Sequence, residues 1–230
     1  MTPQILFFIA DTAPLSDPAV FDNALSLLPP DRQEKTGKYR FRKDKELSLG
    51  AGLLLRKACG DLGIPGADRK IVTGEFGKPA FADFPEVCFN LSHAGTKVLL
   101  SIGTVMNGCD VEMHQDRILK YSERLMTPPE YEDYMREAEE ERKAHFFRLW
   151  TGKESLMKCT GKGFSQPVRS FTLRVDAEGI RLQEPIDGSD YRFFEYFGEK
   201  DYAITLCLRG YEGEAPELKK VILQGEEYYG

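Results

Sequence analysis

The chain has 230 residues, 41% of them hydrophobic, which is enough for one large domain or two small ones with buried cores. Its formal net charge of −6 argues against a general nucleic-acid-binding protein. The five cysteines follow no metal-binding spacing, and the chain shows neither a signal peptide nor a membrane-length apolar run. We therefore expect reduced thiols, a cytoplasmic location and no membrane association.

The first half of the chain predicts strands around one long helix. The apolar run Ile5–Ala10 indicates a buried strand, and a helix is expected from about Pro30 to Leu62. Between Arg32 and Lys45 this helix carries seven basic residues and two acidic ones. Such a patch on an acidic protein indicates one specific anionic ligand or partner, although a solvated helix face gives the same pattern. Further strands are expected at Lys70–Thr73, Val87–Leu91 and Lys97–Met106.

A turn is expected at Asn107-Gly108, which lies between the apolar runs VLLSIGTVM and CDVEM. Asn-Gly in that setting is a strong hairpin signal, because both turn positions require positive φ. We therefore expect a strand over residues 109–113 that pairs back onto the strand at 97–106.

The second half of the chain predicts helices followed by strands. The helices are expected near Ile118–Met126, Pro129–Glu141 and Arg142–Thr160, and the strands at Ser170–Val175, Tyr191–Tyr196 and Tyr202–Leu208. Each half thus combines helices with a small, mostly antiparallel sheet. This combination predicts the α+β fold class.

Two acidic residues on one expected strand indicate a metal site. Asp110 and Glu112 are two positions apart, so their carboxylates project to the same side of the strand. Adjacent like charges repel unless water or a cation compensates them, and carboxylate oxygens suit Mg2+. Two solvated acids on an edge strand remain the alternative interpretation.

The last long helix, HFFRLWTGKESLMKCTGKGF, carries a lysine within an apolar stripe. The stripe consists of Phe146, Leu149, Trp150 and Met157. Lys153 occupies its middle, where a lysine either extends to the surface or meets an anion. Glu154 and Lys158 lie four residues apart at its edge, and a surface ion pair would explain them. It does not explain Lys153, so we interpret the helix as functional.

Two further motifs are weaker signals. His93 follows the apolar run at 89–92 where a strand opens into a loop, and Gly77-Lys78-Pro79 is a short rigid loop with one ammonium group. Each also fits a purely structural role. A carboxylate site, several cations and a histidine, without a Ser-His-Asp set, together indicate in-line displacement at phosphorus on a phosphate-rich ligand.

Four motifs, in this order, resemble those of the phosphopantetheinyl transferases of the surfactin-synthetase-activating type. They are GKP at 77–79, FNLSH at 89–93, GCDVE at 108–112 and LWTGKESLMK at 149–158. The most specific part is the Asp-x-Glu pair followed by W-x-x-K-E-x-x-x-K. The resemblance implies a pseudo-dimer of two similar α/β halves, residues 1–106 and 107–230, with coenzyme A between them and the metal site in the second half.

The resemblance also implies a role for the motif residues. Asp110, Glu112 and Glu154 would hold Mg2+ at the pyrophosphate, and Glu154 would also take the proton of the attacking serine. Lys158 and His93 would act in catalysis with Glu154 and contact the phosphates. The other implied contacts to coenzyme A are Lys35 and Lys38 (or Arg32, Arg40 or Arg42) near the 3'-phosphate, and Ser48, Lys78, Pro79, Ser92 and Lys153.

The implied activity is Mg2+-dependent transfer of 4'-phosphopantetheine from coenzyme A to a serine of an acyl- or peptidyl-carrier protein, by carboxylate-assisted in-line attack on the β-phosphate. The basic segment would steer an acidic carrier protein, with Leu119–Met126 adding apolar contacts. We expect a monomer, because one chain holds both halves. The alternatives are a non-catalytic module that binds coenzyme A or a carrier, and a metal-dependent hydrolase of the pyrophosphate.

Overall fold

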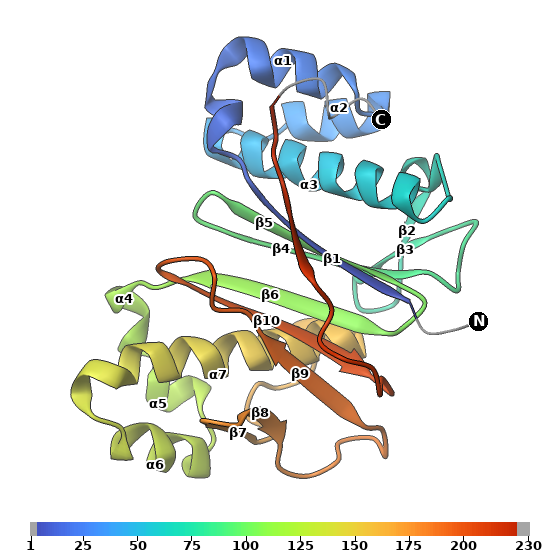
Figure 1. The fold of residues 1–230 in the computed structure, drawn as a ribbon. Helices are drawn as coiled ribbons and strands as arrows, with labels where there is room; N and C mark the ends of the chain where they lie inside the picture. Colours follow the sequence, from blue (N-terminus) through green and yellow to red (C-terminus); the bar gives the residue numbers. More distant parts are fainter. Residues whose placement is uncertain (1–3, 225–230) are drawn as a thin grey trace.

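The computed structural model describes residues 4–224 and contains two principal sheets, each covered by one long helix (Figure 1). The first sheet has the strand order β11-β1-β5-β4 and the second the order β6-β10-β9. The hairpins β2-β3 and β7-β8 lie beside them. Along the described residues no helix combines the length and the apolar character that crossing a bilayer requires. This architecture confirms the predicted α+β class with two halves.

The first sheet and helix α3 (Arg42–Asp61) form the N-terminal half. Strand β5 lies between β1 and β4 and is antiparallel to both. Leu49, Leu53 and Leu54 of α3 are fully buried in the core of this half. The strands are β1 (Ile5–Asp11), β4 (Cys88–Ala94), β5 (Lys97–Gly103) and β11 (Leu218–Val221). The remaining elements are η1 (Ala13–Ser16), α1 (Pro18–Ser26), α2 (Pro30–Gly37), η2 (Ala67–Arg69), β2 (Ile71–Thr73) and β3 (Pro79–Phe81).

The predicted helix from Pro30 to Leu62 is two helices, so this prediction was wrong. Helix α2 ends at Gly37 and α3 begins after Phe41, whose φ of −95° and ψ of 140° are extended. Glycine is a weak helix former, and the polar helix α2 buries only Thr36. The break lets α2 fold onto α3, where Thr36 Oγ1 lies 3.0 Å from Ser48 Oγ.

The second sheet and helix α7 (Glu139–Thr160) form the C-terminal half. Strand β10 lies between β6 and β9 and is antiparallel to both. Helix α7 ends as predicted, because Gly161 adopts a φ of 76°. The predicted helix at Ile118–Met126 is two single turns. The other elements are β6 (Asn107–Met113), α4 (Asp116–Leu119), α5 (Ser122–Leu125), α6 (Pro128–Arg136), η3 (Gly163–Ser165), β7 (Leu173–Asp176), β8 (Gly179–Leu182), β9 (Tyr191–Glu195) and β10 (Tyr202–Arg209).

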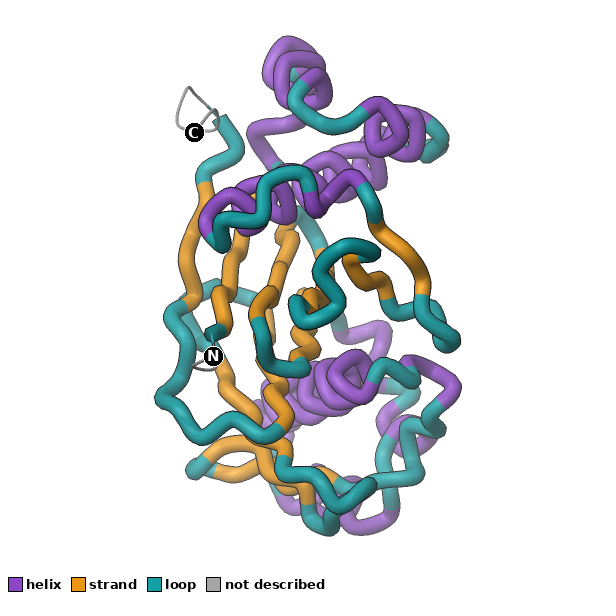
Figure 2. Tube along the Cα trace, turned by 90° about the vertical axis from the view of Figure 1, so that its right-hand side faces the viewer, coloured by secondary structure: helices purple, strands orange, loops and turns teal. Residues whose placement is uncertain are grey.

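Strand β11 returns from the C-terminal half to the first sheet (Figure 1). It runs parallel to β1, with Phe7 opposite Leu218 and Ala10 opposite Val221. In Figure 2 most of the strands lie between the helices of the N-terminal half above and α7 below. Residues 218–221 therefore complete the first sheet, and the division at residue 106 stays a prediction for the other elements.

The predicted hairpin at Asn107-Gly108 was wrong. These residues begin strand β6, which pairs with β10, whereas β5 pairs with β1 and β4. Both residues are described, and neither has the positive φ that such a turn requires. Asn107 is fully buried, and a Cβ atom at Gly108 would collide with the backbone of Ser155 and Cys159 in α7. The glycine is needed for close packing between a strand and a helix.

Candidate functional site

Strand β6 presents two carboxylates toward helix α7. Asp110 and Glu112 alternate with Cys109 and Val111, which are buried in the core between the two sheets. Asp110 is 2% exposed, and Glu112 is partly buried. Trp150 of α7 donates a hydrogen bond from Nε1 to Glu112 Oε1 at 3.3 Å. The prediction that both acids share one face of a strand is confirmed.

Helix α7 brings Glu154 and Lys158 to this strand. The Lys158 ammonium donates hydrogen bonds to Asp110 Oδ1 at 2.6 Å and to Ser92 Oγ at 3.0 Å. Ser92 Oγ in turn donates to Asp110 Oδ1 at 2.7 Å. One hydrogen-bonded group therefore joins β4, β6 and α7, and it contains three of the residues predicted for the site.

The site carries strongly perturbed carboxyl groups. Burial raises the pKa of Glu112 to about 7, and the neighbouring Asp110 adds to the effect. Burial, and then Asp110, likewise raise the pKa of Glu154 to about 7. Burial lowers the pKa of Lys158, but contact with Asp110 outweighs it and raises that pKa above its usual value. One ammonium group thus faces three carboxyl groups and does not compensate them fully.

The chemistry of these residues fits a divalent cation. Asp110 Oδ2 is buried and, among the described residues, has no hydrogen-bond partner, which is costly for a carboxylate oxygen. The available donors are carboxylate oxygens, which Mg2+ prefers. Within residues 4–224 no three His, Cys, Asp or Glu side chains are gathered to hold a metal ion as they stand. The fit therefore depends on the unpartnered oxygen and the uncompensated charge.

The raised pKa values predict how the stability of the metal-free protein depends on pH. A carboxyl group with a pKa of about 7 when folded and 4.5 when unfolded stabilises the fold in its protonated form. This contribution is complete below pH 4.5 and is lost as the pH rises through 7. We expect the free energy of unfolding, measured in EDTA by denaturant titration, to fall by on the order of 2–3 kcal/mol per group between about pH 5 and about pH 8.

A matched pair of variants tests this assignment. Glu154→Gln removes one of the titrating groups, so its free energy of unfolding should fall less over the same pH range. Glu140→Gln, at the exposed start of α7, should follow the wild type. If Glu154→Gln lost as much stability as the wild type, the raised pKa of Glu154 would be refuted.

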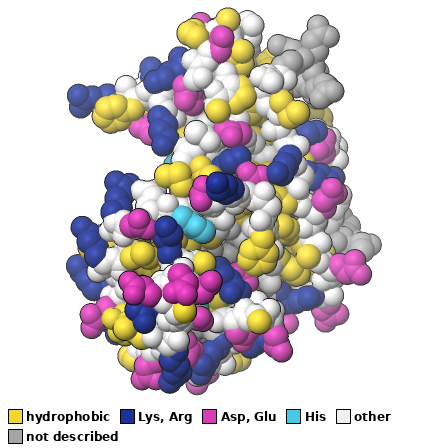
Figure 3. All heavy atoms as spheres, turned by 60° about the vertical axis from the view of Figure 1, so that its left-hand side comes forward, with side chains coloured by type: hydrophobic (Ala, Val, Ile, Leu, Met, Phe, Trp, Pro, Cys, Tyr) yellow, Lys and Arg dark blue, Asp and Glu magenta, His cyan; other side chains and the backbone are white. Residues whose placement is uncertain are grey.

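A cavity of about 440 Å³ opens between helices α2 and α3 and strands β3 and β4. Four residues predicted to contact coenzyme A line it: Lys35, Ser48, Pro79 and His93. Arg32 and Tyr39 line it as well. Figure 3 shows a hollow at the left of the view, with Lys and Arg side chains above and below it. The cavity thus offers an anion two cations, Arg32 and Lys35, although Asp44 also lines it.

The apolar wall of this cavity was missed at the level of sequence. Leu47, Ala51 and Leu55 of α3 line it. They are spaced four residues apart, so helical periodicity places them on one face. That spacing was a usable signal, but it predicted only a packed helix.

Two of the residues predicted to contact coenzyme A, His93 and Lys38, differ in their positions. Partial burial lowers the pKa of His93, and Lys158 lowers it further, so the imidazole is neutral near pH 7. Lys38 does not line the cavity; its ammonium group lies 2.7 Å from the carboxylate of Glu34, and both side chains are exposed. His93 is therefore brought to the site, and Lys38 is not.

Lys78 does not line the cavity, and its predicted contact with the phosphates of coenzyme A stays a prediction. Its ammonium group donates hydrogen bonds to the carbonyl oxygens of Asn107 at 2.8 Å, Lys158 at 2.7 Å and Cys159 at 3.3 Å. The last carbonyl groups of a helix lack partners within the helix and attract cations. Lys78 therefore caps α7 in this structure, although its neighbours Gly77 and Pro79 line the cavity.

Lys153 meets an anion, as predicted, but that anion belongs to the protein. Its Nζ lies 2.7 Å from Glu130 Oε1, and the two side chains are 1% and 0% exposed. It also donates to the carbonyl oxygens of Val168 at 2.8 Å and Phe171 at 3.1 Å. These three acceptors use all three of its hydrogens. In this structure Lys153 thus has no hydrogen left for coenzyme A, and that predicted contact stays a prediction.

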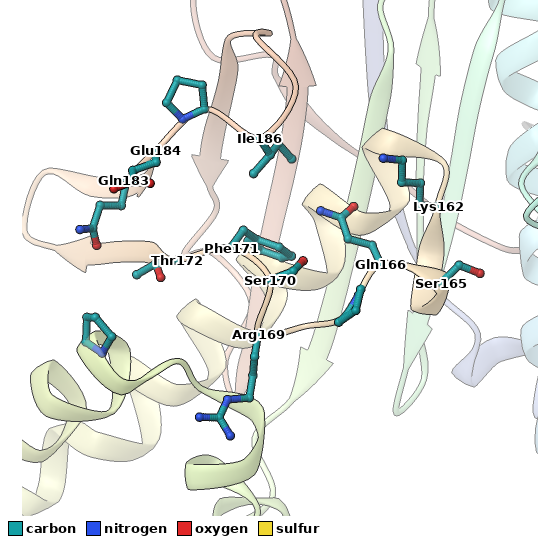
Figure 4. A pocket seen from close by; sticks show the side chains of 13 residues that line it. Lys162, Ser165, Gln166, Arg169, Ser170, Phe171, Thr172, Gln183, Glu184 and Ile186 are labelled. Carbon is teal, nitrogen blue, oxygen red and sulfur yellow. The ribbon is translucent and has the colours of Figure 1, made fainter.

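A larger cavity, of about 710 Å³, borders Phe171. In Figure 4, Lys162 and Gln166 come from the turn after α7, and Gln183, Glu184 and Ile186 come from the segment after β8. The residues that line it include none of the predicted site residues. Cavity volume therefore does not distinguish the two cavities as candidates, whereas four of the predicted site residues line the smaller one.

Comparisons with known proteins agree along most of the chain. Residues 15–104 match the family model "4'-phosphopantetheinyl transferase, N-terminal" and residues 106–207 match "4'-phosphopantetheinyl transferase superfamily". The 4'-phosphopantetheinyl transferase Sfp of Bacillus subtilis (strain 168) is 28% identical over 185 residues, which cover 80% of this chain and 83% of that protein. The transferase psf-1 of Bacillus pumilus is 31% identical over 181 residues, or 78% of each chain. A solved holo-(acyl-carrier-protein) synthase from Bacillus anthracis str. Ames, in complex with CoA (3',5'-ADP), aligns with a TM-score of 0.40 and 17% identity, over 46% of this chain and 95% of that one.

Proposed function

Because the chain belongs to the 4'-phosphopantetheinyl transferase superfamily and is of the Sfp type, we propose that it transfers the 4'-phosphopantetheine group of coenzyme A to a serine of a carrier protein. The observation that carries this proposal is that three acidic residues lie next to a cavity lined in part by cationic side chains. Asp110, Glu112 and Glu154 lie beside a cavity whose lining includes Arg32 and Lys35.

The cavity is suited to the nucleotide part of coenzyme A. Lys35 and Arg32 offer charge to a phosphate, Ser48 offers a hydroxyl group, and the apolar wall of α3 offers a surface for a base. His93 lies where the cavity approaches Lys158, which favours a contact with the phosphates. The exposed basic residues between Lys38 and Lys45 would attract an acidic carrier protein.

Asp110, Glu112 and Glu154 are the residues that would hold Mg2+. When bound, the cation would supply positive charge to the pyrophosphate of coenzyme A. Lys158 supports this arrangement, since its hydrogen bond of 2.6 Å occupies Asp110 Oδ1 and leaves Oδ2 without a partner. The same lysine holds Ser92, so it keeps β4 and β6 together at the site.

The reaction joins the serine oxygen of the carrier to the β-phosphorus of coenzyme A. The bond from that phosphorus to the oxygen leading to the α-phosphate breaks, and 3',5'-ADP leaves. The serine proton passes to Glu154, directly or through water. Without the cation, burial raises the pKa of this carboxyl group to about 7, and a bound cation would lower that pKa and keep the carboxylate ionised to accept the proton.

Mass spectrometry of carrier proteins tests the proposal. Incubation of an apo carrier with coenzyme A, Mg2+ and this protein should yield a carrier heavier by one phosphopantetheine, with 3',5'-ADP released in equal amount. EDTA should prevent the mass gain. No gain on any of several fatty-acid, polyketide and peptidyl carriers would overturn the proposal.

The same experiment separates the two alternatives. A binding module would retain coenzyme A in calorimetry, independently of Mg2+, and leave every carrier unmodified. A hydrolase would release 3',5'-ADP when no carrier is present. Membership of the 4'-phosphopantetheinyl transferase superfamily favours group transfer over both of these alternatives.

A further inference from the structure

The two principal sheets meet along strands β4 and β6, which pack side by side but belong to separate sheets within the described residues (Figure 1). Side chains make the hydrogen bonds between them. Asn90 Oδ1 accepts a hydrogen bond from the backbone N–H of Cys109 at 2.8 Å. The other bonds in this row join Asn107 Nδ2 to the Cys88 carbonyl at 3.1 Å, the Cys109 thiol to the Asn90 carbonyl at 3.4 Å and the Val111 N–H to Ser92 Oγ at 3.4 Å. We call this row of four bonds the seam.

The seam has a constant register. Each bond joins residues 19 positions apart in the chain, so the two strands run parallel and every second residue of β4 faces every second residue of β6. A backbone ladder would bring strands to about 4.8 Å, whereas bonds through side chains require a wider separation. The backbone N–H groups of Cys109 and Val111 therefore depend on polar side chains of β4 for their partners.

Asp110 lies between Cys109 and Val111, the two residues of β6 whose backbone N–H groups bond to side chains of β4. Cys109 is held by Asn90, and Val111 is held by Ser92. Ser92 also touches the Asp110 carboxylate, so it already belongs to the site. Asn90 is 6% exposed and does not line the cavity. Its influence on the site must pass through the backbone on either side of Asp110.

We propose that Asn90 is a positioning residue of the cation site. By accepting the hydrogen bond from Cys109, Asn90 fixes the position of Asp110 relative to β4 and α7. Asp110 Oδ1 then contacts Lys158, and Asp110 Oδ2 remains available to the cation. This inference rests on the proposed Mg2+ site. Partners that orient a ligand residue typically change metal affinity by about 10–100-fold when they are removed, and we expect the lower end of that range here.

Two variants of the same shape test the role of the acceptor. Asn90→Val removes it, whereas Asn90→Thr keeps a hydroxyl group, the group with which Ser92 accepts the Val111 N–H two residues further along the seam. Both residues suit a strand, so both variants should fold. Mn2+ binding is measured by electron paramagnetic resonance without substrate, and folding by thermal unfolding. Asn90→Val should bind Mn2+ about tenfold more weakly than wild type. Asn90→Thr should bind Mn2+ more tightly than Asn90→Val does.

Asn107→Ala controls for a general weakening of the seam. Asn107 is fully buried and bonded to the carbonyls of Cys88 and Val105 and to Ser101, away from the residues that flank Asp110. This variant should lower the melting temperature and leave Mn2+ affinity within about twofold. Equal affinities of Asn90→Val and Asn90→Thr, or an equal loss in Asn107→Ala, would overturn the inference.

Asp110→Asn separates this inference from the proposed function. The variant should abolish Mn2+ binding. If it binds Mn2+ as wild type does, the proposed cation site is wrong and the role of Asn90 fails with it. If it loses Mn2+ while the two Asn90 variants match each other, the cation site stands and only the positioning role is refuted.

Discussion

Glu154→Gln is expected to lower the rate of carrier modification by at least about 100-fold, because an amide cannot take the serine proton and is a poorer ligand for Mg2+. Glutamine keeps the shape of the side chain, so α7 should still pack against β6. The cavity lined by Lys35 and His93 is formed by other elements and should still bind coenzyme A. Single-turnover mass spectrometry gives the rate, and calorimetry gives the affinity for coenzyme A.

Glu140→Gln is the matched control, since it makes the same change on the exposed first turn of α7. It should modify the carrier at the wild-type rate. A wild-type rate in Glu154→Gln would show that another group takes the proton. Loss of coenzyme A binding in Glu154→Gln would instead show that the substitution disturbs the fold.

Lys153→Met is expected to lower the free energy of unfolding by about 3–5 kcal/mol, because it leaves the carboxylate of Glu130 buried without its cation. The carbonyl groups of Val168 and Phe171 also lose their donor. Denaturant titration measures the loss. Coenzyme A affinity of the folded protein should stay at the wild-type value, since Lys153 does not line the cavity.

A second substitution tests the cause of this loss. Glu130→Gln removes the buried charge, but its one oxygen serves only one of the two backbone N–H groups, of Thr127 and Leu173, that bond to separate oxygens of Glu130. Added to Lys153→Met, it should restore about half of the lost stability. Lys143→Met, which breaks an exposed ion pair on the same helix, should cost no more than about 1 kcal/mol. Weaker coenzyme A binding with unchanged stability in Lys153→Met would support the original phosphate contact.

Parts of the fold were predictable because local sequence decides them. The apolar run at 5–10 forms β1, and a glycine with positive φ ends α7 at residue 161. The shared face of Asp110 and Glu112 follows from the alternation of side chains along any strand. It holds although β6 pairs with β10 instead of β5.

Other parts depend on contacts that are distant in sequence. The Asn-Gly pair is typical of a turn, but Asn107 forms a hydrogen bond across the seam, and Gly108 lets α7 pack closely against β6. The pattern around Lys153 showed that it needed an anion and could not show that Glu130 provides it. The same holds for Lys78, which meets carbonyl groups from the end of α7.

The parallel pairing of β11 with β1 affects the order in which the protein can fold during synthesis. The ribosome makes β1 long before β11, because β11 is the last of the described strands. Strands β4 and β5 emerge much earlier and can pair with the other edge of β1. One edge of β1 thus stays open until residues 218–221 have been made, and an open edge binds other strands readily. Nascent or truncated chains that stop before residue 218 are therefore expected to be the species that aggregates.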